Sequence, residues 1–302
     1  MSAGAETIHT PVLLTEVLDY MQPCSGGIYV DGTLGLGGHS EAILQASGPN
    51  GRVIGFEWDD SALLLALKRL RAFGDRLVTI PRNFAELAAG FQERGIETVD
   101  GMLIDIGLSS LQLDSGGRGF SFLKDEPLDM RMDTRRGTTA AKMIAGCSEQ
   151  ELADIFYYYG EEIQARRIAS EIINVRKTAR IETSKQLAEV VYRAIPRRFH
   201  PKKIHVATRT FQGLRIAVNT ELENLAAVID EAALFLRPKA RFCVICFHSL
   251  EDRIVKKKFN ENKLLKVITK KPVTASKNEV ANNPRARSAK LRVAERSDDK
   301  ER

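Results

Sequence analysis

The chain of 302 residues is 43% hydrophobic and 28% charged, which is the composition of a globular protein. Its longest unbroken apolar run covers only residues 62 to 67, and its N-terminus lacks a basic segment followed by an apolar one. We therefore expect no membrane-spanning helix, no signal peptide and a cytoplasmic location. The net charge of +6 favours a polyanionic partner.

The predicted elements alternate between helices and strands in the first third of the chain. Apolar residues at helical spacing alternate with short runs that are typical of strands. The predicted elements are a helix at 12–21, a strand at 28–32, a helix at 39–46, a strand at 52–57, a helix at 61–73, a strand at 76–80, a helix at 85–94 and a strand at 99–106. This alternation predicts an α/β fold with a parallel sheet covered by helices on both faces.

The alternation stops after the fourth strand. Residues 111 to 135 are irregular, and three helical segments follow at 149–159, 161–177 and 184–195. Ser148 and Glu151 have the spacing of a capping box. A helical stretch at 207–236, a strand at 241–247 and two strand candidates at 264–269 and 288–294 resume the sheet. We therefore divide the chain into a sheet domain at 1–114 and 206–302, and a helical insertion at 115–205.

A glycine-rich turn leaves the first strand. Four glycines occupy the seven positions from Gly32 to Gly38, and a helix opens at His39-Ser40. Glycine permits positive φ and lets a ligand approach the backbone closely, while the first N–H groups of a helix favour an anion. The turn therefore predicts a nucleotide-like cofactor. The alternative is a tight strand-to-helix connection without a ligand.

Acidic residues stand at the carboxyl ends of three strands, namely Asp31, Glu57 and Asp105. Ligands of open α/β sheets bind along that edge. Glu57 lies 20 residues after Gly37, where a carboxylate can accept hydrogen bonds from ribose. These features fit NAD or S-adenosylmethionine. Ser40 stands at the last position of G-x-G-x-x-G, which favours S-adenosylmethionine because that cofactor has no pyrophosphate.

The segment Asp105-Ile-Gly-Leu-Ser-Ser110 offers acceptors for a reacting amine. Methyl transfer from a sulfonium depends mainly on positioning the donor and the acceptor. If the acceptor is an exocyclic base amine, Asp105, Ser109 and Ser110 can accept its N–H hydrogen bonds without a metal. The alternative for Asp105 is a strand-end carboxylate that caps local amides.

Basic residues gather in two stretches. No acidic residue lies between 190 and 220, where seven arginines and lysines fall, among them Arg197, Arg198, Lys202 and Lys203. A second basic stretch covers residues 253 to 271. Beside a cofactor fold they favour a nucleic-acid substrate over solvated surface. In the irregular linker, Phe120 and Phe122 either stack on a displaced base or anchor the insertion.

The remaining reactive side chains indicate neither a metal site nor a hydrolase. Cys243 and Cys246 are three apart on a predicted strand, so their thiols face opposite sides of the sheet. His9, His39 and His248 lack ligand spacing. The segment from His248 to Asp252 contains Ser, His and Asp, but no G-x-S-x-G elbow accompanies it.

With these residues assembled, the chain resembles the bacterial RsmH (MraW) family of 16S ribosomal RNA cytosine-N4 methyltransferases. The resemblance is carried by 9–12, 30–40, 105–114, 118–122, 127–133, 159–161, 207–212, 247–255 and 283–288. These motifs follow in order through nearly the whole chain. One departure is Glu57, since the family usually has Asp at that position.

The resemblance implies a class I methyltransferase fold, Rossmann-like with a seven-stranded, mostly parallel sheet, and residues 115–205 as a helical substrate-recognition insertion. It implies S-adenosyl-L-methionine as the methyl donor and a cytosine in the decoding region of 16S rRNA, within the small ribosomal subunit, as the substrate. Carried over by motif, the cofactor contacts are Gly37, Gly38, His39, Glu57, Phe84, Asp105 and Gln112. Asp105 thus has two candidate roles.

Two alternatives remain at this stage. One is the same chemistry on another nucleic acid, although the fourth strand lacks the Asn-Pro-Pro-aromatic type of motif found in DNA amino-methyltransferases. The other is a non-catalytic RNA-binding assembly factor that retains the cofactor fold. The sequence also leaves open whether the chain forms a homodimer.

Overall fold

The structure is a computed structural model that describes residues 11–107 and 117–298. The chain divides into two compact units. We call the first, Met1–Ser109 with Leu222–Arg302, the sheet unit, and the second, Ser110–Glu221, the helical unit. The predicted insertion at 115–205 falls inside the helical unit, whose C-terminal limit lies 16 residues later. Its role in substrate recognition stays a prediction.

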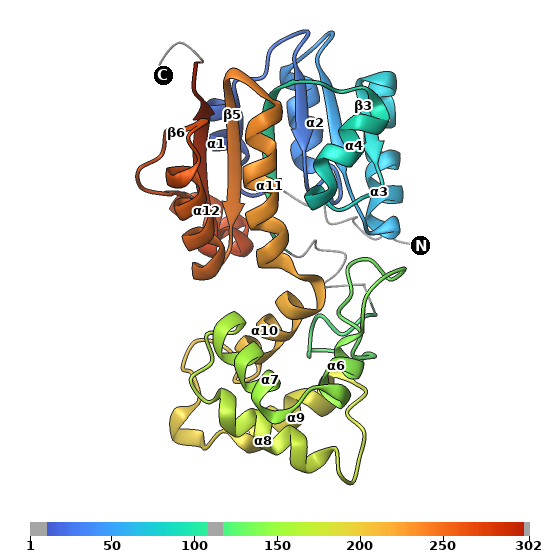
Figure 1. Cartoon of the computed structure of the whole chain (residues 1–302), viewed down its shortest axis with the longest axis vertical. Coiled ribbons are helices and arrows are strands. Elements are labelled where there is room, and N and C mark those ends of the chain that lie inside the picture. Colours follow the sequence, from blue (N-terminus) through green and yellow to red (C-terminus); the bar gives the residue numbers. More distant parts are fainter. Residues whose placement is uncertain (1–10, 108–116, 299–302) are drawn as a thin grey trace. The chain divides into compact units, whose positions relative to one another are not determined.

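The sheet unit contains a mixed, mostly parallel sheet (Figure 1). Its strands lie in the order β3 (Leu77–Ile80), β2 (Arg52–Phe56), β1 (Ile28–Asp31), β4 (Val99–Asp105), β5 (Leu236–Cys246), β8 (Lys290–Arg296) and β6 (Leu265–Val267), and the short β7 (Val273–Thr274) also pairs with β8. The first five strands pair in parallel, and β8 is antiparallel to its neighbours. The predicted α/β class with a mostly parallel sheet is confirmed.

Helices cover both faces of this sheet. On one face α4 (Leu87–Arg94), α11 (Glu221–Phe235) and α12 (Ser249–Glu261) pack in one hydrophobic core. On the other face α1 (Leu14–Met21), α2 (Gly38–Ala46) and α3 (Asp60–Leu70) pack in a second core. Cys246 belongs to the first core and Cys243 to the second, so the two thiols face opposite sides as predicted. None of the helices within 11–107 and 117–298 is both long and apolar enough to cross a bilayer.

Between β6 and β8 the chain is ordered rather than a plain polar loop. It contains β7, the short helix α13 (Lys277–Asn282) and a 3₁₀ turn, η5 (Pro284–Ser288). Glu279 of α13 accepts a hydrogen bond from the Leu13 amide at 2.7 Å. This contact fixes α13 at the start of α1.

The helical unit is built from short helices. They are α6 (Ala140–Gly146), α7 (Glu149–Asp154), the π-helical η3 (Ile155–Tyr159), α8 (Ala165–Val175), α9 (Ser184–Ala194), the 3₁₀ turn η4 (Arg197–Phe199) and α10 (Thr208–Asn219). Three of them, α6, α7 and α9, begin at a side-chain cap. The predicted capping box of Ser148 and Glu151 is present, and Thr183 and Gln186 form another at the start of α9.

One segment predicted as a single helix is two helices in the structure. The stretch at 207–236 is two helices, α10 and α11, which break at Thr220, where φ is 49°. The side chain of Asn219 explains the break, because it accepts from the Met132 amide and donates to the Met130 carbonyl, each at 2.8 Å. These bonds to a distant segment hold the end of α10, and periodicity carries no trace of them.

The two phenylalanines of the irregular linker pack within the helical unit. Phe120 is buried, with the Arg118 guanidinium over its ring. Phe122 stacks on His205 and meets Phe211 edge-on. Arg131 of the same linker forms a bidentate pair with Asp129, at 2.7 and 2.9 Å. The anchoring interpretation is therefore the better one for both rings.

Candidate functional site

The candidate site lies in the sheet unit, at the carboxyl end of β1. There the sheet order reverses, since β1 pairs with β2 on one side and with β4 on the other (Figure 1). Such a switch point leaves a crevice at the ends of the strands, where α/β proteins bind ligands. Asp31 ends β1, Glu57 follows β2 and Asp105 ends β4. The three predicted acidic positions therefore share one edge.

The glycine turn is fixed to both neighbouring strands. The Gly32 amide donates to Leu103 of β4 at 2.8 Å, and the Leu34 amide donates to Phe56 of β2 at 2.9 Å. Gly35 and Gly37 have positive φ, of 52° and 80°. The turn thus takes the backbone path for which glycine is the least strained residue.

Packing within the protein explains two of the glycines. A Cβ on Gly37 would lie 2.8 Å from a Leu70 methyl group, and one on Gly38 would lie 2.6 Å from the Pro11 ring. The sequence interpretation, that these glycines make room for a ligand, is therefore incomplete. Their absence of a side chain lets α2 approach α3 and the segment before α1.

The start of α2 provides free donors. Gly37 is the N-cap, and the amides of Gly38 and His39 donate to no acceptor within the described residues. Two unpaired N–H groups at a helix N-terminus favour an anionic group. The carboxylate of a methionine-type cofactor has the charge and the acceptors that these amides require.

Asp31 has a structural role in this edge. Its carboxylate accepts hydrogen bonds from the Ser40 hydroxyl at 2.7 Å and from the Thr33 amide at 3.2 Å. Burial raises the pKa of Asp31, although these hydrogen bonds oppose the shift. The side chain is 1% exposed, so Asp31 ties the turn to α2.

Glu57 reaches back to the glycine turn. One carboxylate oxygen accepts from the Gly35 amide at 2.8 Å, and the other accepts from the Asp59 amide at 2.9 Å. Asp59 in turn caps α3 by accepting from the Ser61 amide. Burial raises the pKa of Glu57 to about 7, although the backbone hydrogen bonds oppose the shift. A carboxylate has about four lone-pair sites, so Glu57 retains acceptor capacity for a ligand hydroxyl.

Asp105 and His39 face each other across the edge. His39 Nε2 donates to the Val12 carbonyl at 3.0 Å, and its Nδ1 lies 3.6 Å from an Asp105 oxygen. The other Asp105 oxygen, Oδ1, is buried and accepts no hydrogen bond from the described residues. Burial raises the pKa of Asp105 to about 6, and His39 opposes the shift. A buried acceptor without a donor at a ligand edge fits an N–H group of a bound molecule.

Phe84 lies beside the same turn. It opens the 3₁₀ turn η2 (Phe84–Glu86) after β3. A Cβ placed on Gly32 would lie 3.3 Å from the Cβ of Phe84. Phe84 therefore lies at the same edge as the glycine turn, and its predicted contact with the cofactor stays a prediction.

Glu251 also belongs to this edge, since the segment from His248 to Asp252 follows the fifth strand as the sequence indicated, but the sequence interpretation gave this residue no role. Glu251 is fully buried in the first turn of α12, and it accepts from the amides of Phe247 and His248. A Cβ on Gly107, just after β4, would lie 3.2 Å from the Phe247 ring, so the ends of β4 and β5 are in contact. The Glu251 charge also contributes to the raised pKa of Asp105. The signal available in the sequence was that residues 248–252 directly follow the strand β5.

Comparisons with known proteins now decide the family. The model of the MraW methylase family matches residues 6–297. The chain belongs to the MraW methylase family.

Named relatives match this chain over almost its full length. A "Ribosomal RNA small subunit methyltransferase H" of Desulfotalea psychrophila is 61% identical over 292 residues, which cover 97% of this chain and 99% of the relative. The protein of the same name from Geobacter sulfurreducens is 49% identical, and the match covers 95% of this chain and 98% of the relative. Both relatives are thus named as methyltransferases of the small-subunit ribosomal RNA.

Most of the site residues predicted for an MraW methylase lie together. Gly37, Gly38, His39, Glu57, Phe84 and Asp105 all belong to the edge around β1. Ser109, Ser110 and Gln112 lie outside the described residues, so their predicted roles stay predictions. Among residues 11–107 and 117–298 no cluster of three His, Cys, Asp or Glu side chains could hold a metal ion.

Proposed function

We propose that this MraW-family chain transfers a methyl group from S-adenosylmethionine to the exocyclic N4 of a cytosine. The proposed substrate is the decoding region of 16S rRNA within the small ribosomal subunit, in the cytoplasm. The proposal is carried by the buried Oδ1 of Asp105, which accepts no hydrogen bond from residues 11–107 and 117–298, and by the α2 amides, which likewise have no acceptor there, in a chain 61% identical to a small-subunit rRNA methyltransferase.

The chain's own residues fit the cofactor by their chemistry. The amides of Gly38 and His39 supply donors for a carboxylate, and Glu57 supplies an acceptor for ribose hydroxyls. Phe84 supplies an apolar contact for a purine ring. Bound S-adenosylmethionine supplies an electrophilic methyl group on a sulfonium.

Asp105 has the chemistry for an amine. Its Oδ1 can accept an N–H from the purine amine of the cofactor or from the cytosine N4. We favour the cofactor role, because the family motif assigns Asp105 to that contact. If Asp105 contacts the cytosine instead, its hydrogen bond from the N4 amine strengthens as the nitrogen becomes tetrahedral and its lone pair is withdrawn from the ring. Ser109 and Ser110 are proposed as further acceptors.

The test is single-turnover transfer of labelled methyl from S-adenosylmethionine to purified small subunits. We expect label in 16S rRNA and, after nucleoside digestion, in N4-methylcytidine. Asp105→Asn should remove most of the transfer, while the surface variant Glu97→Ala should transfer as the parent does.

The alternatives predict different outcomes of the same assay. Label in DNA or transfer RNA instead of 16S rRNA would replace the substrate and keep the chemistry. Binding to subunits without any transfer would support a non-catalytic assembly factor. Light scattering of the same preparation tests the homodimer that the sequence leaves open.

A further inference from the structure

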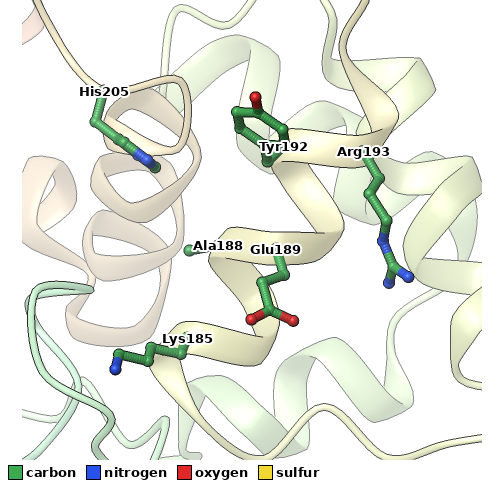
Figure 2. A pocket seen from close by; sticks show the side chains of 6 residues that line it. All are labelled: Lys185, Ala188, Glu189, Tyr192, Arg193 and His205. Carbon is green, nitrogen blue, oxygen red and sulfur yellow. The ribbon is translucent and has the colours of Figure 1, made fainter.

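A cavity of about 410 Å³ lies at α9 in the helical unit. Figure 2 shows the side chains that line it. Its size is in the range of small-molecule and nucleotide pockets. Six residues line it: Lys185, Ala188, Glu189, Tyr192, Arg193 and His205. Five of them come from α9, and Figure 2 shows His205 facing this helix from a separate segment, the loop before α10.

Two aromatic side chains of this cavity are available for stacking. One face of His205 stacks on Phe122, with ring centroids 4.5 Å apart and an interplanar angle of 29°. His205 is nevertheless exposed, so its other face is accessible. Tyr192 is 45% exposed, although its ring also meets His200. Exposed rings held by other rings are platforms for nucleobases.

The charges on this stretch of α9 are unusual because they do not pair. Lys185, Glu189 and Arg193 are spaced by four residues, which normally brings opposite charges together on a helix. None of the three makes an ion pair or a side-chain hydrogen bond with a described residue. The cavity therefore presents two cations and one carboxylate to a ligand.

The surroundings extend the positive charge. Arg197, Arg198, Lys202 and Lys203 follow α9 and are all exposed, and no acidic residue lies between 190 and 220. Arg198 lies over the exposed ring of Phe199, with 4.8 Å from its guanidinium carbon to the ring centroid. Cations interleaved with exposed aromatic rings are typical of surfaces that bind single-stranded nucleic acid.

We propose that the α9 cavity is a subsite for one unpaired nucleotide of the RNA substrate, separate from the methylated cytosine. The base stacks against Tyr192 and His205, and Lys185 and Arg193 contact phosphate. Glu189 accepts a hydrogen bond from a base amine or a ribose hydroxyl. An acidic peptide fits less well, because Glu189 would repel it and the two rings would have no partner. The proposal rests on the proposed function for the identity of the RNA.

The test is fluorescence anisotropy of the full chain with a labelled single-stranded RNA of about twelve nucleotides, within the usual site sizes. We expect Tyr192→Ala to weaken binding about tenfold, since base stacking on an aromatic ring has that magnitude. Tyr192→Phe keeps the ring and should stay within about twofold. Arg193→Ala should lower the slope of log affinity against log salt by about 0.7.

The matched control is Lys142→Ala, which removes one exposed cation from α6 of the same unit, outside the cavity. Its affinity and salt slope should equal those of the parent. The subsite is overturned if Tyr192→Ala binds the RNA as tightly as the parent, or if Lys142→Ala weakens binding as much as Arg193→Ala. Methyl transfer to small subunits is measured on the same proteins. A parent that transfers no label overturns the proposed function, while the binding series still decides the subsite.

Discussion

The carboxylate of Glu57 accepts a hydrogen bond from the backbone amide of Gly35, 22 residues earlier in the chain, at 2.8 Å. The side chain thereby couples the end of β2 to the glycine turn after β1. A second bond from the Asp59 amide couples it to the start of α3. Glu57 thus shapes the crevice as well as offering an acceptor to a ligand.

We predict that Glu57→Ala weakens S-adenosylmethionine binding at least tenfold. The substitution removes a ribose acceptor and leaves the Gly35 and Asp59 amides without their partner, and each hydrogen bond to a charged group contributes about 1.5–3 kcal/mol. Titration calorimetry measures the affinity, and Trp58, the single tryptophan and the neighbour of Glu57, gives an independent fluorescence signal. Glu97→Ala, at an exposed position of the same unit, is the control. Unchanged affinity would refute the role of Glu57.

Cofactor affinity should rise with pH. The pKa of Glu57 is about 7 without ligand, and ribose hydroxyls donate to the ionised form, so binding releases a proton. We expect S-adenosylmethionine to bind about tenfold more weakly at about pH 6 than at about pH 8. Glu57→Gln should lose most of this dependence, with a remainder near pH 6 from Asp105, whose pKa is about 6.

Without cofactor, the stability of the protein should fall as the pH rises, whereas the cofactor affinity rises. The pKa of Glu57 in the folded state lies above its usual value of 4.5, so the folded state binds more protons than the unfolded state between these two values. The free energy of unfolding therefore falls as the pH rises through this interval. Urea denaturation across the same pH range measures this free energy of unfolding. In the binding experiment, a cofactor affinity that does not vary with pH would count against the assignment of Glu57.

The basic loop after α9 should dominate RNA binding. Arg197, Arg198, Lys202 and Lys203 are exposed and make no ion pair with the described residues, so their charge is available for phosphate. Replacing all four by Ala should weaken RNA binding and reduce the salt slope by about 3, at about 0.7 per contact. Filter binding at several salt concentrations measures this slope.

The second basic stretch provides the comparison. On α12, Lys257 lies 3.9 Å from Glu261, and Lys258 pairs with Asp230. The double variant Lys257→Ala/Lys258→Ala should therefore change the salt slope less than Arg197→Ala/Arg198→Ala, although both remove two charges. Equal effects would mean that total charge, rather than this loop, determines RNA affinity.

Strand ends and turns were predictable from the sequence because their signals are local. The run before Asp31, the glycine density after it and the alternation of elements depend on neighbouring residues. The break at Thr220 was not predictable, since it depends on bonds from Asn219 to a segment almost 90 residues earlier. That the α2 amides and the Oδ1 of Asp105 have no partner in the described part of the chain likewise emerges only once the chain is folded.

The role of Glu251 was not predictable for a different physical reason. It belongs to a capping box, but the N-cap residue is His248 rather than the usual Ser or Thr, so the sequence signature is absent. His248 Nδ1 accepts from the Glu251 amide at 3.4 Å, while its Nε2 lies 2.8 Å from a Glu251 oxygen. A histidine in the role of a cap is recognisable only from this geometry.

Glu251 should support both the fold and the titration of Asp105. Glu251→Ala leaves the amides of Phe247 and His248 without an acceptor, so we expect a loss of about 2–4 kcal/mol in the free energy of unfolding. Burial is the main cause of the raised pKa of Asp105, and the charge of Glu251 adds to it. Glu251→Gln keeps an oxygen acceptor and removes that added charge. The Gln variant should therefore be more stable than the Ala variant, and its pH profile of methyl transfer should move toward acid.

Urea denaturation and pH-dependent transfer to small subunits separate these two effects of Glu251. Glu261→Ala, at the exposed C-terminal end of α12, is the control, because its ion pair with Lys257 is exposed and contributes at most about 1 kcal/mol. A Gln variant whose pH profile coincides with that of the parent would contradict the electrostatic coupling. An Ala variant as stable as Glu261→Ala would contradict the capping role, because two partly buried amides would lose their acceptor in it.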